Sequence, residues 1–268
     1  MTSEPTTAPA ASPAPRGAFA PARRPSRAVL RAEARLFLRE PGNFFWIAVF
    51  PPGLLTILGL IPTFREPSPD LGGLRLIETY VPVTVLVALI VAGVQALPPV
   101  ITGYRERGIL RRMSATPVRP SALLFAQMGL HGVAALVSAL LSLAIGRLAY
   151  DVRLPEQIAG YLLALLLAAA ASLAMGALVA AFSPTAKIAT AVGSAVFLPM
   201  MFAAGVWLPV QAMPDALATV VGLLPFGAAA EALGRATGGS WPDWSSLGIL
   251  ALWAIALTGA ATRWFRWQ

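Results

Sequence analysis

Long apolar blocks alternate with short polar segments along most of this chain. Six of the blocks are long enough to cross a bilayer, because a helical crossing takes about 20 residues. Charged residues are nearly absent inside these blocks and gather in the segments between them. The pattern predicts an all-α membrane protein with six transmembrane helices, at approximately residues 44–63, 80–102, 122–146, 158–182, 188–208 and 245–263.

The residues before the first span divide into a polar tail and a short periodic helix. Residues 1–25 are rich in Pro, Ala, Ser and Thr, a composition that predicts a disordered cytosolic tail. Residues 26–41 place apolar side chains on one side at helical spacing, which predicts an amphipathic helix in the membrane interface or, alternatively, a solvated one. The other side of this helix carries arginines: Arg31, Arg35 and Arg39. The six-span domain then occupies residues 42–268.

Composition narrows the class further, because 57% of the residues are apolar and only 12% are charged. A soluble domain has about 45–50% apolar and about 25% charged residues, so a soluble enzyme is excluded. The chain has no cysteine, which removes thiolate catalysis and Cys-ligated metals. The one lysine, Lys187, is not part of a phosphate-binding Gly-Lys-Ser/Thr loop. No cofactor is expected on this chain.

The distribution of basic residues predicts the orientation. Fifteen of the 20 Lys and Arg residues fall before span one, between spans two and three, between spans four and five, or after span six. By the positive-inside rule, both termini are expected in the cytosol. The Arg-rich, Lys-poor and Ala-rich composition is typical of a GC-rich bacterial genome. We therefore expect a multi-pass protein of the bacterial cytoplasmic membrane.

Ionisable groups within the spans are scarce, and they argue against two kinds of chemistry. His131 is the clear case, and ion-coupled carriers usually have a carboxylate near the midplane as well. Ser194 lacks the Gly-x-Ser-x-Gly setting of a nucleophile, so intramembrane proteolysis is not supported. We interpret His131 as a hydrogen-bonded packing residue.

Span four carries a small residue at every fourth position, which would let two helix backbones approach closely in lipid. The sequence leaves open whether this face packs inside the subunit or between subunits. The stripe consists of Ala164, Ala168, Ser172, Gly176 and Ala180.

Span five and the segment after it offer candidate substrate contacts. Soft and aromatic side chains surround an expected kink at Pro199, and they suit either a greasy substrate or ordinary packing. These candidates are Met200, Met201, Phe202 and Trp207. Residues 209–244 are too long for a turn and too interrupted for a span, and they predict two short amphipathic helices. Such a segment could form an outer gate that includes Pro225 and Glu231.

The loop between spans two and three, residues 104–120, is the most informative segment. It carries five arginines against one glutamate, and Ile109, Leu110 and Met113 share one side of a short helix that begins after Gly108. The helix is expected to end at Thr116-Pro117. A basic helix with a small apolar face can lie on anionic lipid, or it can dock into a groove on a cytosolic partner.

The residues of this loop resemble a known family. The pattern Arg-Glu-Arg-Gly-x-Leu-Arg-Arg-x-x-Ala-Thr-Pro-Val at 105–118 is similar to the loop of ABC-2 type exporter permeases. The segment 31–41 is similar to the interfacial helix of that family. The segment 224–233 resembles its Asn-Pro-Leu-x-x-x-x-Glu-Ala-Leu signature, with Leu224 in place of the Asn.

The resemblance implies the ABC-2 exporter fold, with cytosolic termini and pairing as a homodimer or heterodimer. It also implies contact with membrane lipid and two separate cytosolic ABC ATPase subunits, and no nucleic-acid partner. The interfacial helix and the loop would form the ATPase contact. The implied ATPase-coupling residues are Arg105, Glu106, Arg107, Gly108, Leu110, Arg111, Arg112, Thr116 and Pro117.

The sequence thus predicts the permease subunit of an ATP-driven exporter. Its substrate would be hydrophobic or amphipathic, such as a drug, an antibiotic, a lipid or a lipid-linked molecule, and antibiotic resistance by efflux would be one such role. Two alternatives remain. One is an ATP-independent carrier or channel, and the other is a scaffold for membrane assembly without a transport role.

Overall fold

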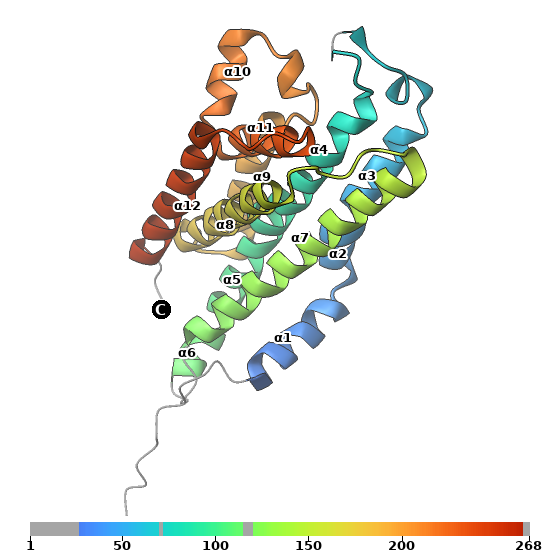
Figure 1. Cartoon of the computed structure of the whole chain (residues 1–268). Coiled ribbons are helices and arrows are strands. Elements are labelled where there is room, and N and C mark those ends of the chain that lie inside the picture. The colour runs from blue at the N-terminus through green and yellow to red at the C-terminus, as the bar shows by residue number, and fades with distance from the viewer. Residues whose placement is uncertain (1–26, 70–71, 115–119, 265–268) are drawn as a thin grey trace, which may run out of the picture.

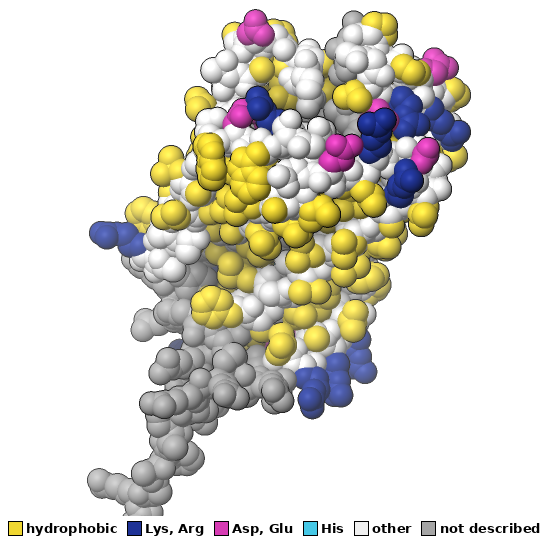
Figure 2. Space-filling view, in the orientation of Figure 1, with side chains coloured by type: hydrophobic (Ala, Val, Ile, Leu, Met, Phe, Trp, Pro, Cys, Tyr) yellow, Lys and Arg dark blue, Asp and Glu magenta, His cyan; other side chains and the backbone are white. Residues whose placement is uncertain are grey.

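The computed structural model describes residues 27–69, 72–114 and 120–264, and these residues are helical almost throughout (Figure 1). Among them are six helices long and apolar enough to cross a membrane, so the predicted all-α fold with six spans is confirmed. Figure 2 shows apolar side chains in a broad band across the middle of the molecule and charged side chains toward its two ends. The spans are Pro41–Gly59, Leu76–Glu106, Leu123–Tyr150, Ile158–Phe182, Ala186–Ala203 and Trp244–Trp264.

Spans one and two are each assembled from shorter helical pieces. The N-terminal half comprises α1 (Arg27–Arg39), α2 (Pro41–Phe44), η1 (Phe45–Val49), α3 (Phe50–Gly59), η2 (Pro62–Phe64), α4 (Leu76–Ile90), η4 (Val91–Ala96), α5 (Leu97–Glu106) and α6 (Ile109–Ser114). The C-terminal half comprises α7 (Pro120–Tyr150), α8 (Ile158–Phe182), α9 (Ala186–Ala203), η5 (Val210–Ala212), α10 (Asp215–Gly222), α11 (Pro225–Thr237) and α12 (Trp244–Trp264).

Proline pairs shape spans one and two in the same way. The π-helical segment η4 directly precedes α5, which contains Pro98 and Pro99, and η1 directly precedes α3, which contains Pro51 and Pro52. Proline has no N–H for the carbonyl four residues back, and its ring crowds that carbonyl. The helix therefore widens for one turn just before each pair.

Spans one and five end earlier than the sequence predicts. Span one ends at Gly59 instead of near residue 63, and Pro62 begins a separate 3-10 turn after an extended Ile61. Span five ends at Ala203 instead of residue 208, because Gly205 has a positive φ of 85° that stops the helix. The apolar sequence continues past both ends, but the helical backbone does not.

Span two forms the centre of the bundle, and its middle is packed closely against α8. A Cβ on Gly176 would lie 1.8 Å from the carbonyl oxygen of Gly93, so glycine is required for this approach. One turn away, the Ser172 hydroxyl donates a hydrogen bond of 2.6 Å to the Leu89 carbonyl. The small-residue stripe of span four is therefore an internal packing face against span two.

The segment between spans five and six contains two helices, α10 and α11, whose axes differ by 102°. A Cβ on Gly227 would lie 2.0 Å from the Val221 carbonyl oxygen, so glycine is what allows the sharp fold. The Trp253 indole N–H of α12 donates to the Leu223 carbonyl at 2.9 Å and ties this hairpin to span six. In Figure 1 the hairpin lies at the end of the bundle opposite α1 and α6.

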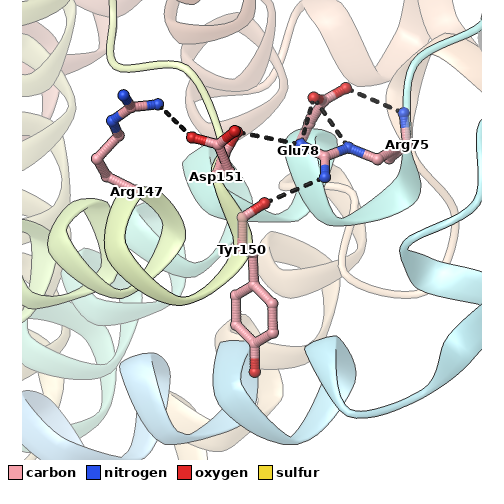
Figure 3. A network of polar contacts seen from close by, with 5 residues as sticks. All are labelled: Arg75, Glu78, Arg147, Tyr150 and Asp151. Carbon is pink, nitrogen blue, oxygen red and sulfur yellow. Dashed lines mark hydrogen bonds and ion pairs between the residues drawn. The ribbon is translucent and has the colours of Figure 1, made fainter.

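A polar network fixes the start of α4 to the end of α7 at the hairpin end (Figure 3). The Arg75 guanidinium pairs with Glu78 at 2.8 Å, and it also donates to the backbone carbonyls of Tyr150 at 3.1 Å and Asp151 at 3.3 Å. Arg147 pairs with the Asp151 carboxylate at 2.6 Å. The Arg75 side chain, at the start of α4, thereby joins spans two and three at this end.

Candidate functional site

The predicted coupling segment lies at the end of the bundle where α1 also lies (Figure 1). Span two ends at Glu106, the chain turns at Gly108, and α6 follows at once. Gly108 has a φ of 65°, a left-handed conformation that favours glycine. The short helix α6 packs on α5 and α7, so it joins the helix that enters the loop to the helix that leaves it.

Two of the expected docking residues face the interior of the protein. The Arg105 guanidinium donates hydrogen bonds to the carbonyls of Ser183 and Ala180, at the C-terminal end of α8. A cation in this position satisfies carbonyls that have no partner within the helix. Leu110 is 1% exposed and anchors α6 to the bundle, so it is not part of a surface for a partner.

The remaining described residues of the motif are on the surface. Glu106, Arg107, Arg111 and Arg112 are exposed. The Arg107 guanidinium lies over the ring of Tyr104, 5.5 Å from its centroid, and the Arg112 guanidinium donates to the Arg107 carbonyl at 3.2 Å. The surface of α6 is therefore basic and held in a defined arrangement. Thr116 and Pro117 lie outside the described residues.

Helix α1 presents its arginines outward and an acidic residue inward. Arg31, Arg35 and Arg39 are exposed, whereas Glu33 is only 8% exposed and Phe37 is buried. The helical pattern predicts a single apolar side for this helix, but among its large apolar residues Leu30, Leu36 and Phe37 only Phe37 faces the bundle. Leu30 and Leu36 are about half exposed, as side chains in contact with lipid would be.

The buried carboxylate of Glu33 joins three elements. One of its oxygens accepts a hydrogen bond of 2.7 Å from the Tyr104 hydroxyl on α5 and one of 2.6 Å from the Gln127 amide on α7. The same amide also donates to the Tyr104 oxygen at 3.1 Å. This cluster is not among the residues that the sequence pattern predicted. Its signal was a single acidic residue four positions before Phe37, on the inward side of an arginine-rich helix.

His131 belongs to the same region, as a packing residue. Its Nδ1 lies 2.8 Å from the Gln127 carbonyl oxygen, and its ring meets the edge of Phe37 with centroids 5.2 Å apart. A carbonyl can only accept, so Nδ1 carries the proton in this contact. The interpretation of His131 as a hydrogen-bonded packing residue agrees with this geometry.

The candidate substrate contacts of span five lie in different environments. Met200 and Met201 are buried in the core of this subunit, and Phe202 is partly buried against it. Trp207 is 57% exposed. The four side chains therefore do not form one surface, and only Trp207 presents a large aromatic face to the outside.

Two neighbouring cavities occur at the hairpin end. The larger has a volume of about 600 Å³ and reaches from the start of α4 to α11, with Glu78, Arg153 and Glu156 among its lining residues. The smaller, of about 410 Å³, is lined by residues of α10 and by Glu231 of α11. Glu231 accepts a hydrogen bond of 3.1 Å from Ser246, at the start of α12.

Pro225, the other candidate gate residue, occupies the first position of α11 and is buried. The backbone N–H at this position has no partner within a helix, so proline, which lacks it, is well tolerated there. Leu224, which stands where the family signature has Asn, precedes α11 and makes no side-chain cap hydrogen bond.

Comparison with known families identifies the class of protein. The family described as ABC-2 type transporter matches residues 26–235, which is more than half of the chain. The match spans α1, the loop that carries α6, and the chain as far as α11. A search of curated proteins found no match.

This chain belongs to the ABC-2 type transporter family. It is a multi-pass membrane permease, a domain that does not itself hydrolyse ATP, and permeases of this family generally pair with ABC ATPase subunits.

Proposed function

We propose that this permease is the membrane subunit of an ATP-driven exporter, and that a cytosolic ATPase subunit docks on the surface formed by α6 and α1. The observation that carries the proposal is the basic helix α6, held at the end of the bundle between span two and span three. Its exposed arginines supply charge for an acidic groove, and Gly108 and Leu110 fix the direction in which it points.

The proposed path of the conformational signal follows from the contacts of the coupling segment. Arg105 connects the end of span two to the end of α8, and α6 packs on both α5 and α7. A displacement of α6 by the ATPase would therefore reach spans two, three and four together. The N-terminal tail, residues 1–25, and both termini would lie in the cytosol, in the membrane of a bacterial cell.

The substrate is proposed to move outward between two permease subunits, identical or homologous. The middle of span two is buried inside this subunit, whereas spans three, five and six expose apolar side chains such as Leu140, Leu198 and Ile255. A hydrophobic or amphipathic molecule would find its contacts on such surfaces. Among the four candidates of span five, Trp207 is the one positioned to touch it.

The hairpin of α10 and α11 is proposed as the outer gate. Its sharp bend covers one end of the bundle, and Glu231 and Trp253 attach it to span six. Broken helices are tolerated at membrane depth where protein covers them or where they line a cavity. The second condition holds here, because the two cavities of this end are lined in part by α10 and α11.

The experiment that tests the proposal is co-purification of the tagged permease in mild detergent from its own cells. An ATPase subunit is expected to accompany the native chain. The double variant Arg111→Glu, Arg112→Glu reverses the charge of α6 and is expected to lose the ATPase while still inserting into the membrane. The matched control Arg111→Lys, Arg112→Lys keeps the charge and is expected to retain the subunit.

Three outcomes would contradict the proposal. Retention of the ATPase by the Glu variant would show that α6 is not the docking surface. Absence of any ATPase with the native chain, together with transport by this chain alone in liposomes, would favour an ATP-independent carrier. A bound partner without ATPase activity would favour an assembly scaffold.

A further inference from the structure

A buried carboxylate in the part of the molecule closest to the docking surface requires an explanation. Glu33 is 8% exposed, and no Lys or Arg forms an ion pair with it among the described residues. Burial of a charge is costly unless hydrogen bonds compensate. Here two donors, the Tyr104 hydroxyl and the Gln127 amide, meet on one carboxylate oxygen at 2.7 and 2.6 Å.

The two donors lie on α5 and α7, the helices on either side of α6 in the chain. Tyr104 is four residues before the turn at Gly108, in the last turn of α5. Gln127 lies in the first part of α7, the helix that leaves the segment. Glu33 thus connects the interfacial helix to the helix that enters the coupling segment and to the helix that leaves it.

Helices α1 and α7 make a second contact one helical turn further along. Glu33 meets Gln127, and Phe37 meets His131, with ring centroids 5.2 Å apart. The spacing of four residues is the same on both helices, so α1 and α7 run parallel and in register here. One polar and one aromatic contact together fix the rotation of α1 about its own axis.

The Glu33 cluster also contacts an arginine of the motif at 105–118. The ring of Tyr104, whose hydroxyl binds Glu33, carries the Arg107 guanidinium over its face at 5.5 Å from the centroid. The Arg107 carbonyl in turn accepts a hydrogen bond from the Arg112 guanidinium. A continuous set of contacts therefore runs from the surface of α6 to the buried carboxylate of α1.

We propose that Glu33 is a positioning residue that makes α1, α6 and the adjoining ends of spans two and three move as one unit. This inference rests on the proposed function, since the unit is what an ATPase subunit would displace. Loss of the Glu33 contacts would leave the α6 part of the docking surface in place, but it would separate α1 from the motion of α6.

Two variants test the contacts without changing the exposed arginines. Glu33→Ala removes the acceptor, and Tyr104→Phe removes one donor while keeping the ring under Arg107. The matched control is Tyr161→Phe, because the Tyr161 hydroxyl is buried and has no hydrogen-bond partner among the described residues. Glu33→Gln keeps an acceptor oxygen in place and serves as the conservative variant.

The first measurement is hydrogen–deuterium exchange of the permease alone in nanodiscs. Exchange at the α1 amides is expected to accelerate about tenfold or more in Glu33→Ala, as the loss of two buried hydrogen bonds to the same acceptor predicts. Tyr104→Phe is expected to show a smaller acceleration, and Glu33→Gln and Tyr161→Phe little change. Unchanged exchange in Glu33→Ala would overturn the proposal.

The second measurement separates positioning from mere stability. The chain has no cysteine, so spin labels at Leu148→Cys of α7 and Val220→Cys of α10 report the far end of the bundle cleanly. In the complex with its ATPase, trapping with ATP and vanadate is expected to change this distance in the native chain. In Glu33→Ala the change is expected to be lost although the ATPase remains bound, and Glu33→Gln is expected to restore it.

The outcomes distinguish this inference from the function beneath it. A vanadate-induced change that persists in Glu33→Ala overturns the positioning role and leaves the exporter proposal intact. Failure of the native chain to bind any ATPase overturns the exporter proposal. The exchange measurement, made on the permease alone, still decides whether Glu33 holds α1.

Discussion

At the scale of single residues, glycines decide how closely the spans approach. Gly176 and Gly93 face each other across α8 and η4, and a methyl group at Gly176 would meet a backbone oxygen at 1.8 Å. A backbone atom cannot rotate away as a flexible side chain can, so the two helices would have to separate. The neighbouring Ser172 hydroxyl bond to Leu89 depends on the same close packing.

Gly176→Ala is therefore expected to lower stability by about 1–3 kcal/mol, the usual range for an overpacked core. The measurement is thermal unfolding in detergent followed by a solubility or fluorescence assay. Gly129→Ala is the control, because a Cβ there would have no atom within 4 Å and α7 continues through it. That control should be neutral or slightly stabilising, since alanine favours helices. Equal effects of the two substitutions would contradict the packing argument.

At the scale of elements, short polar clusters hold the spans together at their ends. Arg75 joins α4 to the end of α7 at the hairpin end, and Glu33 joins α1 to α5 and α7 at the other. Within each cluster, hydrogen bonds to partly buried groups contribute more than exposed ion pairs. The Arg75 guanidinium is about one quarter exposed, whereas Asp151, in the pair with Arg147, is 85% exposed.

Arg75→Ala is accordingly expected to destabilise the protein by about 1–3 kcal/mol, because it leaves two carbonyls without their donor and removes the ion pair with Glu78. Arg147→Ala, the comparison within the same network, is expected to cost less than about 1 kcal/mol. Thermal unfolding of both variants in one detergent measures the difference. A larger effect of Arg147→Ala would show that the exposed pair, and not the bridge to the backbone, holds these helices.

At the scale of the whole molecule, the two ends of the bundle differ in charge. The α1 and α6 end presents arginines on both helices, whereas the hairpin end mixes acidic and basic residues such as Glu156, Arg153 and Asp215. An excess of arginine marks the cytosolic side of membrane proteins. The distribution therefore predicts that the hairpin faces outward.

Single cysteines test this orientation directly, because the native chain has none to label. Leu148→Cys, near the hairpin end, replaces a residue that is 86% exposed, and Leu38→Cys on α1 replaces a residue that is 68% exposed. In intact cells a membrane-impermeant maleimide is expected to label the first and to label the second only after lysis. The reverse pattern would invert the topology and would place α6 out of reach of any cytosolic ATPase.

The sequence by itself determined the number of spans, their approximate places and the basic segment between spans two and three. These features depend on local composition. The thickness of a bilayer determines the length of an apolar block, and a glycine before a segment and a proline after it limit that segment to a short helix. Span four kept the predicted bounds, and span six shifted by one residue at each end. The motif at 105–118 was equally local, and it led to the family that the comparison then showed.

The tertiary structure decided which side of each element faces the protein. Only the packed bundle shows that the small-residue stripe of α8 lies against span two, that Arg105 caps α8, and that Glu33 is enclosed by Tyr104 and Gln127. In a membrane protein, lipid and protein interior are both apolar, so hydrophobicity does not tell one from the other. Contacts between residues far apart in the chain supply that distinction, and they exist only once the helices have packed.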